Sequence, residues 1–124
     1  MTLFLSTHQL ATISDIAIDG RALVRDVALL AAVAGRPAAE FGGISAFPTI
    51  HHKAGALLHA CVSSHPLVDG NKRLAWLAAC VFLQVNGQRL VAPEDDAFDL
   101  VMAAASNSAT PGQIARRLSI WSSS

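Results

Sequence analysis

The chain has 124 residues, of which 52% are hydrophobic and 15% are charged, and nine Lys and Arg residues balance nine Asp and Glu residues. This length provides for one hydrophobic core, so we expect a single domain over residues 1–124. A formal charge of zero argues against direct binding of nucleic acid, which normally requires a basic excess. The high apolar content predicts an exposed apolar groove that receives a partner.

The sequence gives no sign of membrane insertion or secretion. The longest uninterrupted apolar run, residues 74–83, is too short to span a bilayer. Residues 1–5 lack the basic start and long apolar stretch of a secretion signal, so we expect a cytoplasmic protein. Cys61 and Cys80 fall within apolar helical patterns, which favours buried free thiols over a disulfide or a nucleophile.

Helix signals dominate the first third of the chain. Ser6 and Gln9 form a capping box that predicts a helix ending near Gly20. Its inner face is expected to carry Leu10, Ile13, Ile16 and Ala17. A second helix is expected from about residue 21 or 24 to residue 34, before a glycine and a proline. The glycines and proline of the segment 41–48 then predict a short flap or β-hairpin.

Four further helices are expected in the rest of the chain. One spans about residues 50–64, and the next spans residues 71–86, where nearly continuous apolar residues indicate a buried central helix. Pro93 is expected to open a fifth helix as its first residue, and the capping box of residues 110–113 opens a sixth. Residues 122–124 are expected to be a frayed tail. The predicted fold is all-α, with about six helices and a flap before the central pair.

The segment His65–Arg73 lies between the two central helices and combines groups suited to a polyphosphate. Lys72 and Arg73 enter an apolar helix whose first backbone N–H groups are unpaired, which predicts an anion cradle. Asp69 offers an oxygen ligand of the kind that Mg²⁺ shares with phosphates. His65 has the chemistry of a general base for an attacking hydroxyl.

Structural roles are the alternatives for each of these residues. The alternative role of His65 is to cap the carbonyls at the end of its helix. The alternative role of Asp69 and of Asn71 is to cap the start of the next helix. Gly70 indicates either positive φ or a close approach of the backbone to phosphate. Lys72 and Arg73 together also fit a pair of solvated surface charges.

The histidines outside this segment give only weak support for a metal site. His51 and His52 are adjacent, so on a helix they point about 100° apart, and neither His8 nor His59 completes a four-ligand spacing. We therefore interpret His51, His52 and Lys53 as residues at a helix start near the flap.

The central segment resembles the motif of the Fic/Doc family, His-x-Phe-x-Asp/Glu-Gly-Asn-x-Arg. The match falls on His65, Asp69, Gly70, Asn71 and Arg73. The variable position is lysine here, as in the Doc, or death-on-curing, branch. The resemblance is good over the middle and end of the chain and loose over the first part. It implies a Fic/Doc helical fold, in which the order of helices agrees with the one expected above.

Several positions distinguish this chain from the family motif or from the Fic branch. Leu67 replaces the phenylalanine of the motif, and we expect it to anchor the turn in the core equally well. The Fic branch usually has glycine where Lys72 stands and a second arginine where Trp76 stands. Trp76 and its neighbour Leu77 supply no phosphate contact, which bears on the efficiency of transfer.

The resemblance also implies an activity, cofactors and partners. A Doc-like toxin would act as a protein kinase, transferring the γ-phosphate of ATP with Mg²⁺ to a hydroxyl of a translation factor, in that family a threonine of elongation factor Tu. His65 would then be the base, Asp69 the metal ligand, and Gly70, Asn71, Lys72 and Arg73 the nucleotide site. Arg36 and the flap would contact the substrate, and a Phd-like antitoxin would fold into the apolar groove. The alternatives are AMP transfer of the Fic type and a catalytically weak member that only binds a partner.

Overall fold

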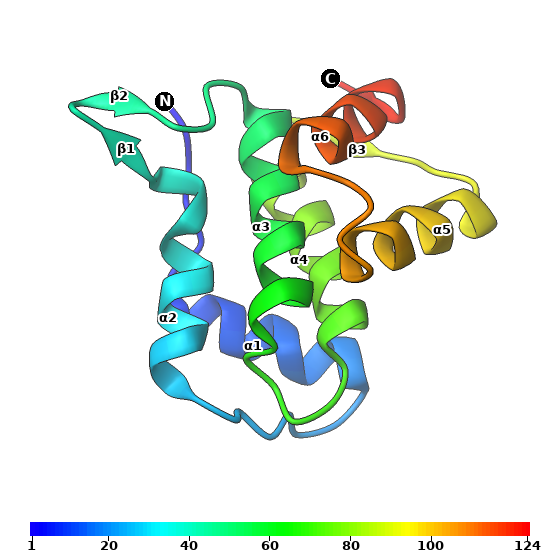
Figure 1. Cartoon of the computed structure of the whole chain (residues 1–124). Coiled ribbons are helices and arrows are strands. Elements are labelled where there is room, and N and C mark those ends of the chain that lie inside the picture. The colour runs from blue at the N-terminus through cyan, green and yellow to red at the C-terminus, as the bar shows by residue number, and fades with distance from the viewer.

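The computed structural model describes residues 1–124 as six α-helices with two short antiparallel strand pairs (Figure 1). The helices are α1 (Thr7–Ile18), α2 (Val27–Gly35), α3 (Ile50–Ser64), α4 (Asn71–Val85), α5 (Glu94–Ala105) and α6 (Pro111–Ile120). The short elements are the 3-10 turn η1 (Arg36–Ala38) and the strands β1 (Glu40–Phe41), β2 (Ile44–Ser45), β3 (Arg89–Leu90) and β4 (Ser122–Ser123). The expected helical fold with a hairpin before the central helices is confirmed.

The two central helices carry the core. Figure 1 shows α3 and α4 at the centre, α1 across one end of them, α2 on one side, and α5 and α6 on the other. A cluster of 25 buried residues joins these elements. Gly55 shows how closely α3 and α6 pack, because a Cβ at this position would lie 2.6 Å from the Pro111 carbonyl oxygen. None of the six helices combines the length and the hydropathy that a membrane span requires.

Local sequence signals set most helix ends. Ser6 Oγ accepts from Gln9 N at 3.0 Å while Gln9 Oε1 accepts from Ser6 N at 2.9 Å, so the capping box at the start of α1 is confirmed. Thr110 and Gln113 form the same reciprocal pair at the start of α6. Each box satisfies two N–H groups that would otherwise be unpaired at a helix start.

The second helix begins later than expected, at Val27. The Asp26 carboxylate accepts from Ala28 N and Leu29 N and thereby caps α2. Residues 21–25 form no helix, and Val24 lies in an antiparallel bridge to Leu67. Tertiary pairing with the loop before α4 therefore overrides the helical pattern of this segment.

Three smaller expectations were also wrong. Ile16 is 64% exposed rather than inward, because the buried face of α1 consists of Leu10, Ile13 and Ser14. Pro93 precedes α5 as its N-cap, and Glu94 is the first helical residue. The tail is paired rather than frayed, since Ser122 and Ser123 lie opposite β3.

Candidate functional site

The loop between α3 and α4 is fixed by its own residues. Leu67 is 1% exposed, so it anchors the loop in the core, as expected for the residue that replaces phenylalanine. The Asn71 side chain accepts from Leu67 N at 2.9 Å and donates to Leu67 O at 3.0 Å. This two-way clamp ties the first residue of α4 to the middle of the loop, so the loop and the helix start form one unit.

Gly70 is required for both backbone conformation and space. Its φ is +88°, a left-handed value that side chains disfavour. A Cβ at this position would also lie 2.5 Å from Ile18 Cγ2. The close neighbour is thus the end of α1, and the glycine lets α1 pack directly against the start of α4.

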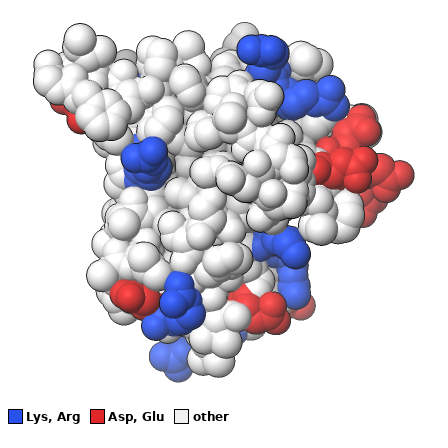
Figure 2. Space-filling model, viewed as in Figure 1, with Lys and Arg blue, Asp and Glu red and all other residues white.

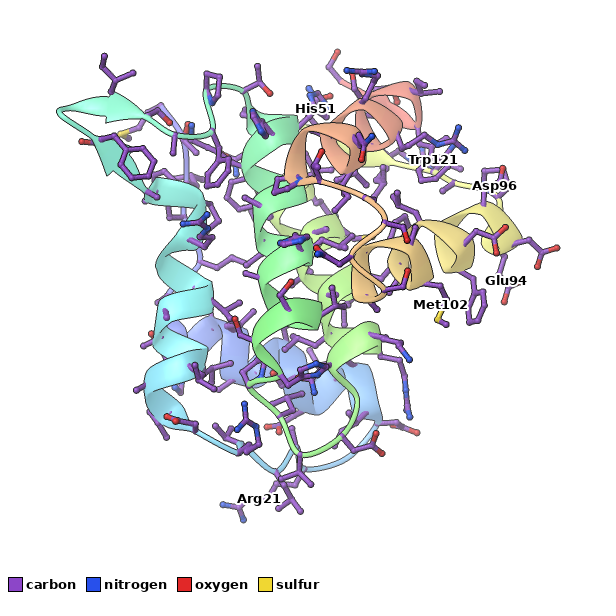
Figure 3. The ribbon with its side chains drawn as sticks, in the orientation of Figure 1. Arg21, His51, Glu94, Asp96, Met102 and Trp121 are labelled. Atoms are coloured by element: carbon purple, nitrogen blue, oxygen red, sulfur yellow. The ribbon has the colours of Figure 1, made fainter.

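A cavity of about 380 Å³ gathers the residues that the sequence singled out (Figure 3 shows the side chains around the loop). Its lining contains His65, Asp69, Gly70, Asn71, Lys72 and Arg73, together with Val62, Val68 and Ala105. The lining comes from three helices and the loop, with Ala105 at the end of α5 closing one side. All six residues predicted for catalysis and nucleotide binding therefore border the same space.

The start of α4 has the features of an anion site. Its N-cap, Gly70, provides no side-chain cap, so the first amides of the helix lack an intrahelical acceptor. Asp69 Oδ1 accepts from Gly70 N at 2.8 Å and forms no cap on α4. Lys72 and Arg73 are exposed on the first turn, which adds two positive charges to the positive end of the helix dipole.

His65 ends α3 in a left-handed conformation, with φ 52° and ψ 61°. The carbonyls at this helix end are bonded by Arg25, whose Nε donates to His65 O at 2.7 Å and whose Nη2 donates to Ser64 O at 2.8 Å. The imidazole is thus not the group that caps the helix, and it borders the cavity. Arg25 is the residue of this site that the sequence analysis missed, because its partners lie 39 and 40 positions away.

The cavity fits a metal ion that arrives with phosphates rather than one held by protein alone. Asp69 is exposed and is the one carboxylate in the lining. The chain has no group of three His, Cys, Asp or Glu residues that could hold a metal ion. One carboxylate together with phosphate oxygens and water is a donor set that Mg²⁺ accepts.

The non-helical strip of residues 20–26 lies directly against the loop. Leu23 O accepts from Val68 N at 2.9 Å, and Arg25 N donates to Pro66 O at 2.8 Å. A cavity of about 250 Å³ continues from the loop between α3 and α4 to this strip, with Arg21 and Leu23 on its wall beside Asp69. Figure 3 shows Arg21 projecting at this end of the molecule.

The β1–β2 hairpin lies at the other end of α3 from His65 (Figure 1), and a 15-residue helix is about 22 Å long. Lys53, which is buried, anchors the hairpin by donating from Nζ to Ser45 Oγ and to Phe47 O. Arg36 stacks over the Phe47 ring, with its Cζ 5.0 Å from the ring centroid. The hairpin therefore does not lie beside the loop, whereas the substrate contact expected for Arg36 and the hairpin stays a prediction.

An apolar groove of about 670 Å³ opens next to the cavity around His65 and Asp69. It is lined by parts of α1, α4 and α5, and nine of its twelve lining residues are hydrophobic. Lys72 and Arg73 border both the groove and the cavity. Glu94, Asp95 and Asp96 lie in the first turn of α5, and Figure 2 shows acidic side chains gathered on this side of the molecule.

The two thiols are not nucleophile candidates. Cys61 and Cys80 are free. Burial raises the pKa of the Cys61 thiol to about 12 and that of the Cys80 thiol to about 11. Both are therefore protonated near neutral pH, and the thiolate is the reactive form.

Comparison with known proteins agrees with the geometry of the loop. A model of the Fic/DOC family matches residues 3–83, which include α1 to α3, the loop and most of α4. The chain is also 45% identical over 95 residues to Toxin Doc of Mycolicibacterium smegmatis, covering 77% of this chain and 73% of that protein. This chain belongs to the Fic/Doc family.

Proposed function

We propose that the protein is a toxin of a toxin–antitoxin system and that it transfers the γ-phosphate of ATP to a hydroxyl of a translation factor, such as a threonine of elongation factor Tu. The observation that carries this proposal is the cavity in which His65 and Asp69 meet Lys72 and Arg73 at the uncapped start of α4. Lysine at position 72 is typical of the Doc branch, and the similarity to Toxin Doc points the same way.

The proposed reaction is an in-line displacement at phosphorus. The acceptor oxygen attacks the γ-phosphorus while its proton passes to the His65 imidazole, and the bond from the γ-phosphorus to the β,γ-bridging oxygen breaks to release ADP. Lys72, Arg73 and the first amides of α4 stabilise the charge that develops on the phosphoryl oxygens. Arg73 offers a planar fork to two oxygens, whereas Lys72 acts as a mobile point charge.

Asp69 is the proposed ligand for Mg²⁺. One of its oxygens is engaged by Gly70 N, which orients the carboxylate and leaves its second oxygen for the ion. When bound, Mg²⁺ would neutralise phosphate charge and so help ADP to leave.

The acceptor segment of the target is proposed to lie along residues 20–26. This strip borders the loop, and its Leu23 side chain is 67% exposed. Arg21 and Leu23 line the cavity that continues to Asp69 and Arg73. A hydroxyl presented there lies close to the loop, whereas the hairpin is a helix length away.

The apolar groove beside the cavity is the proposed site for the antitoxin. Exposed apolar side chains line it, among them Ile16, Phe98 and Met102. An amphipathic segment that folds as it binds would cover this surface. Ile16→Asp together with Met102→Asp should therefore abolish protection by the antitoxin and leave toxicity intact, whereas the same change at exposed Val91, outside the groove, should preserve protection.

Labelling distinguishes phosphoryl from AMP transfer. The protein is incubated with a cell extract and with ATP labelled at either the γ or the α phosphate. Label from the γ position on a target, lost in His65→Ala, supports the kinase. Label from the α position alone would replace this proposal with AMP transfer, and wild-type expression that leaves growth unchanged would favour a member that only binds a partner.

A further inference from the structure

We propose that Arg25 is a positioning residue that holds His65 in its reactive orientation, an inference that rests on the phosphoryl transfer proposed above. Arg25 makes three contacts at the end of α3. Its Nε and Nη2 donate to His65 O at 2.7 Å and to Ser64 O at 2.8 Å, and its backbone N donates to Pro66 O at 2.8 Å. One residue thus bonds three consecutive carbonyls, with His65 in the middle.

The conformation of His65 explains why these three hydrogen bonds from Arg25, called the Arg25 clamp below, are needed. Helices often end with a left-handed residue, usually glycine, because a Cβ disfavours that region. His65 occupies it with φ 52° despite its side chain. A change in the backbone angles of His65 would move its carbonyl away from the guanidinium, so the clamp and the direction of the imidazole are linked.

The clamp acts on His65 and leaves the phosphate side of the site to other residues. Asn71 fixes the loop to α4 through Leu67, and Lys72 and Arg73 project from α4 itself. The guanidinium of Arg25 lies on the carbonyls of α3, where a positive charge also complements the helix dipole. Loss of Arg25 should therefore impair proton removal by His65 and leave nucleotide binding nearly unchanged.

The test compares Arg25→Ala with Arg25→Lys and with Thr49→Ala. Thr49 caps the opposite end of α3, where its Oγ1 accepts from His52 N at 2.9 Å, so this control weakens the same helix far from His65. Phosphoryl transfer to the purified target is measured at varied ATP, and backbone chemical shifts of His65 report its φ and ψ.

A misplaced catalytic group costs up to about 100-fold in rate, so we expect kcat to fall about 10- to 100-fold in Arg25→Ala, with KM for ATP within about twofold. Arg25→Lys, which spans one carbonyl instead of two, should recover part of the loss, and free guanidinium ion should partly rescue Arg25→Ala. Thr49→Ala should keep the wild-type kcat at a temperature where all variants are folded.

Two results would overturn the inference: an unchanged kcat in Arg25→Ala, or an equal loss in Thr49→Ala. A wild-type protein that transfers no phosphate would instead defeat the proposed function. In that case the His65 chemical shifts still test whether Arg25 positions His65, because the inference predicts that they change in Arg25→Ala and not in Thr49→Ala.

Discussion

Replacing Gly70 with alanine tests whether the loop is held against α1. The left-handed φ of Gly70 alone costs a side chain about 1–2 kcal/mol. The added Cβ would also lie 2.5 Å from Ile18 Cγ2. This methyl group is bonded directly to the Cβ of a β-branched side chain, so it cannot move aside without a change of the χ1 rotamer. Overpacking of this kind costs about 1–3 kcal/mol, so we expect Gly70→Ala to lower the free energy of unfolding by about 3 kcal/mol in all.

Gly87 supplies the matched control. It has nearly the same conformation, with φ +85°, but nothing lies within 4 Å of the position of its Cβ. Gly87→Ala therefore carries only the conformational cost, about 1–2 kcal/mol. Ile18→Ala removes the clashing methyl group, so in that background the cost of Gly70→Ala should fall to the value for Gly87→Ala.

The free energies are measured by urea denaturation followed by circular dichroism, for the single variants and for Gly70→Ala combined with Ile18→Ala. The predicted signature is a coupling energy of about 1–2 kcal/mol between positions 18 and 70. Equal destabilisation by Gly70→Ala and Gly87→Ala would show that the contact with α1 does not restrict the loop. A Gly70→Ala cost that is unchanged by Ile18→Ala would refute the reasoning in the same way.

Three further changes test the site and the core. His65→Ala should lower phosphoryl transfer about 10²- to 10⁴-fold with little change in stability, and an active variant in the labelling assay would remove His65 from the chemistry. Asn71→Ala deletes both hydrogen bonds to Leu67 and should lower the free energy of unfolding by about 1–3 kcal/mol in urea denaturation. A near-neutral result would show that the loop does not need the hydrogen bonds between Asn71 and Leu67. Burial raises the pKa of the Cys61 thiol from 9.0 to about 12, so the folded state retains a proton that the unfolded state loses, and stability should fall as pH rises above about 9. Cys61→Ala should reduce that alkaline loss, and an identical pH dependence of stability in wild type and variant would contradict this origin.

Local patterns predicted most of the fold because many of its elements are set by nearby residues. The capping boxes at Ser6 and Thr110 fixed the starts of α1 and α6, since their partners lie three positions away. The loop residues were found for a similar reason. His65, Asp69 and Lys72 are close in sequence, and a turn between two helices brings them to one cavity.

The errors fall where distant segments decide the structure. Residues 21–25 carry a helical pattern, yet they pair with the loop around Leu67, more than 40 positions away. Arg25 was missed because a lone arginine before a helix gives no local sign that it bonds carbonyls on another helix. The hairpin was correctly expected, but its distance from His65 depends on the length and direction of α3, which the motif does not encode.

Trp76 shows how the rest of the fold accommodates a departure from the family motif. Its ring lies 6.3 Å from that of Trp121 in an edge-to-face arrangement at 72°, and Arg117 covers the other tryptophan with its Cζ 5.0 Å from the ring centroid. Trp121 is held in turn because its carbonyl accepts from Val91 N at 3.0 Å beside the β3–β4 pair. Position 76, where the Fic branch usually has its second arginine, is thus part of the packing between α4 and the C-terminal segment in this chain. In the proposed reaction, the cationic contacts that α4 makes to phosphate would therefore come from Lys72 and Arg73 in its first turn.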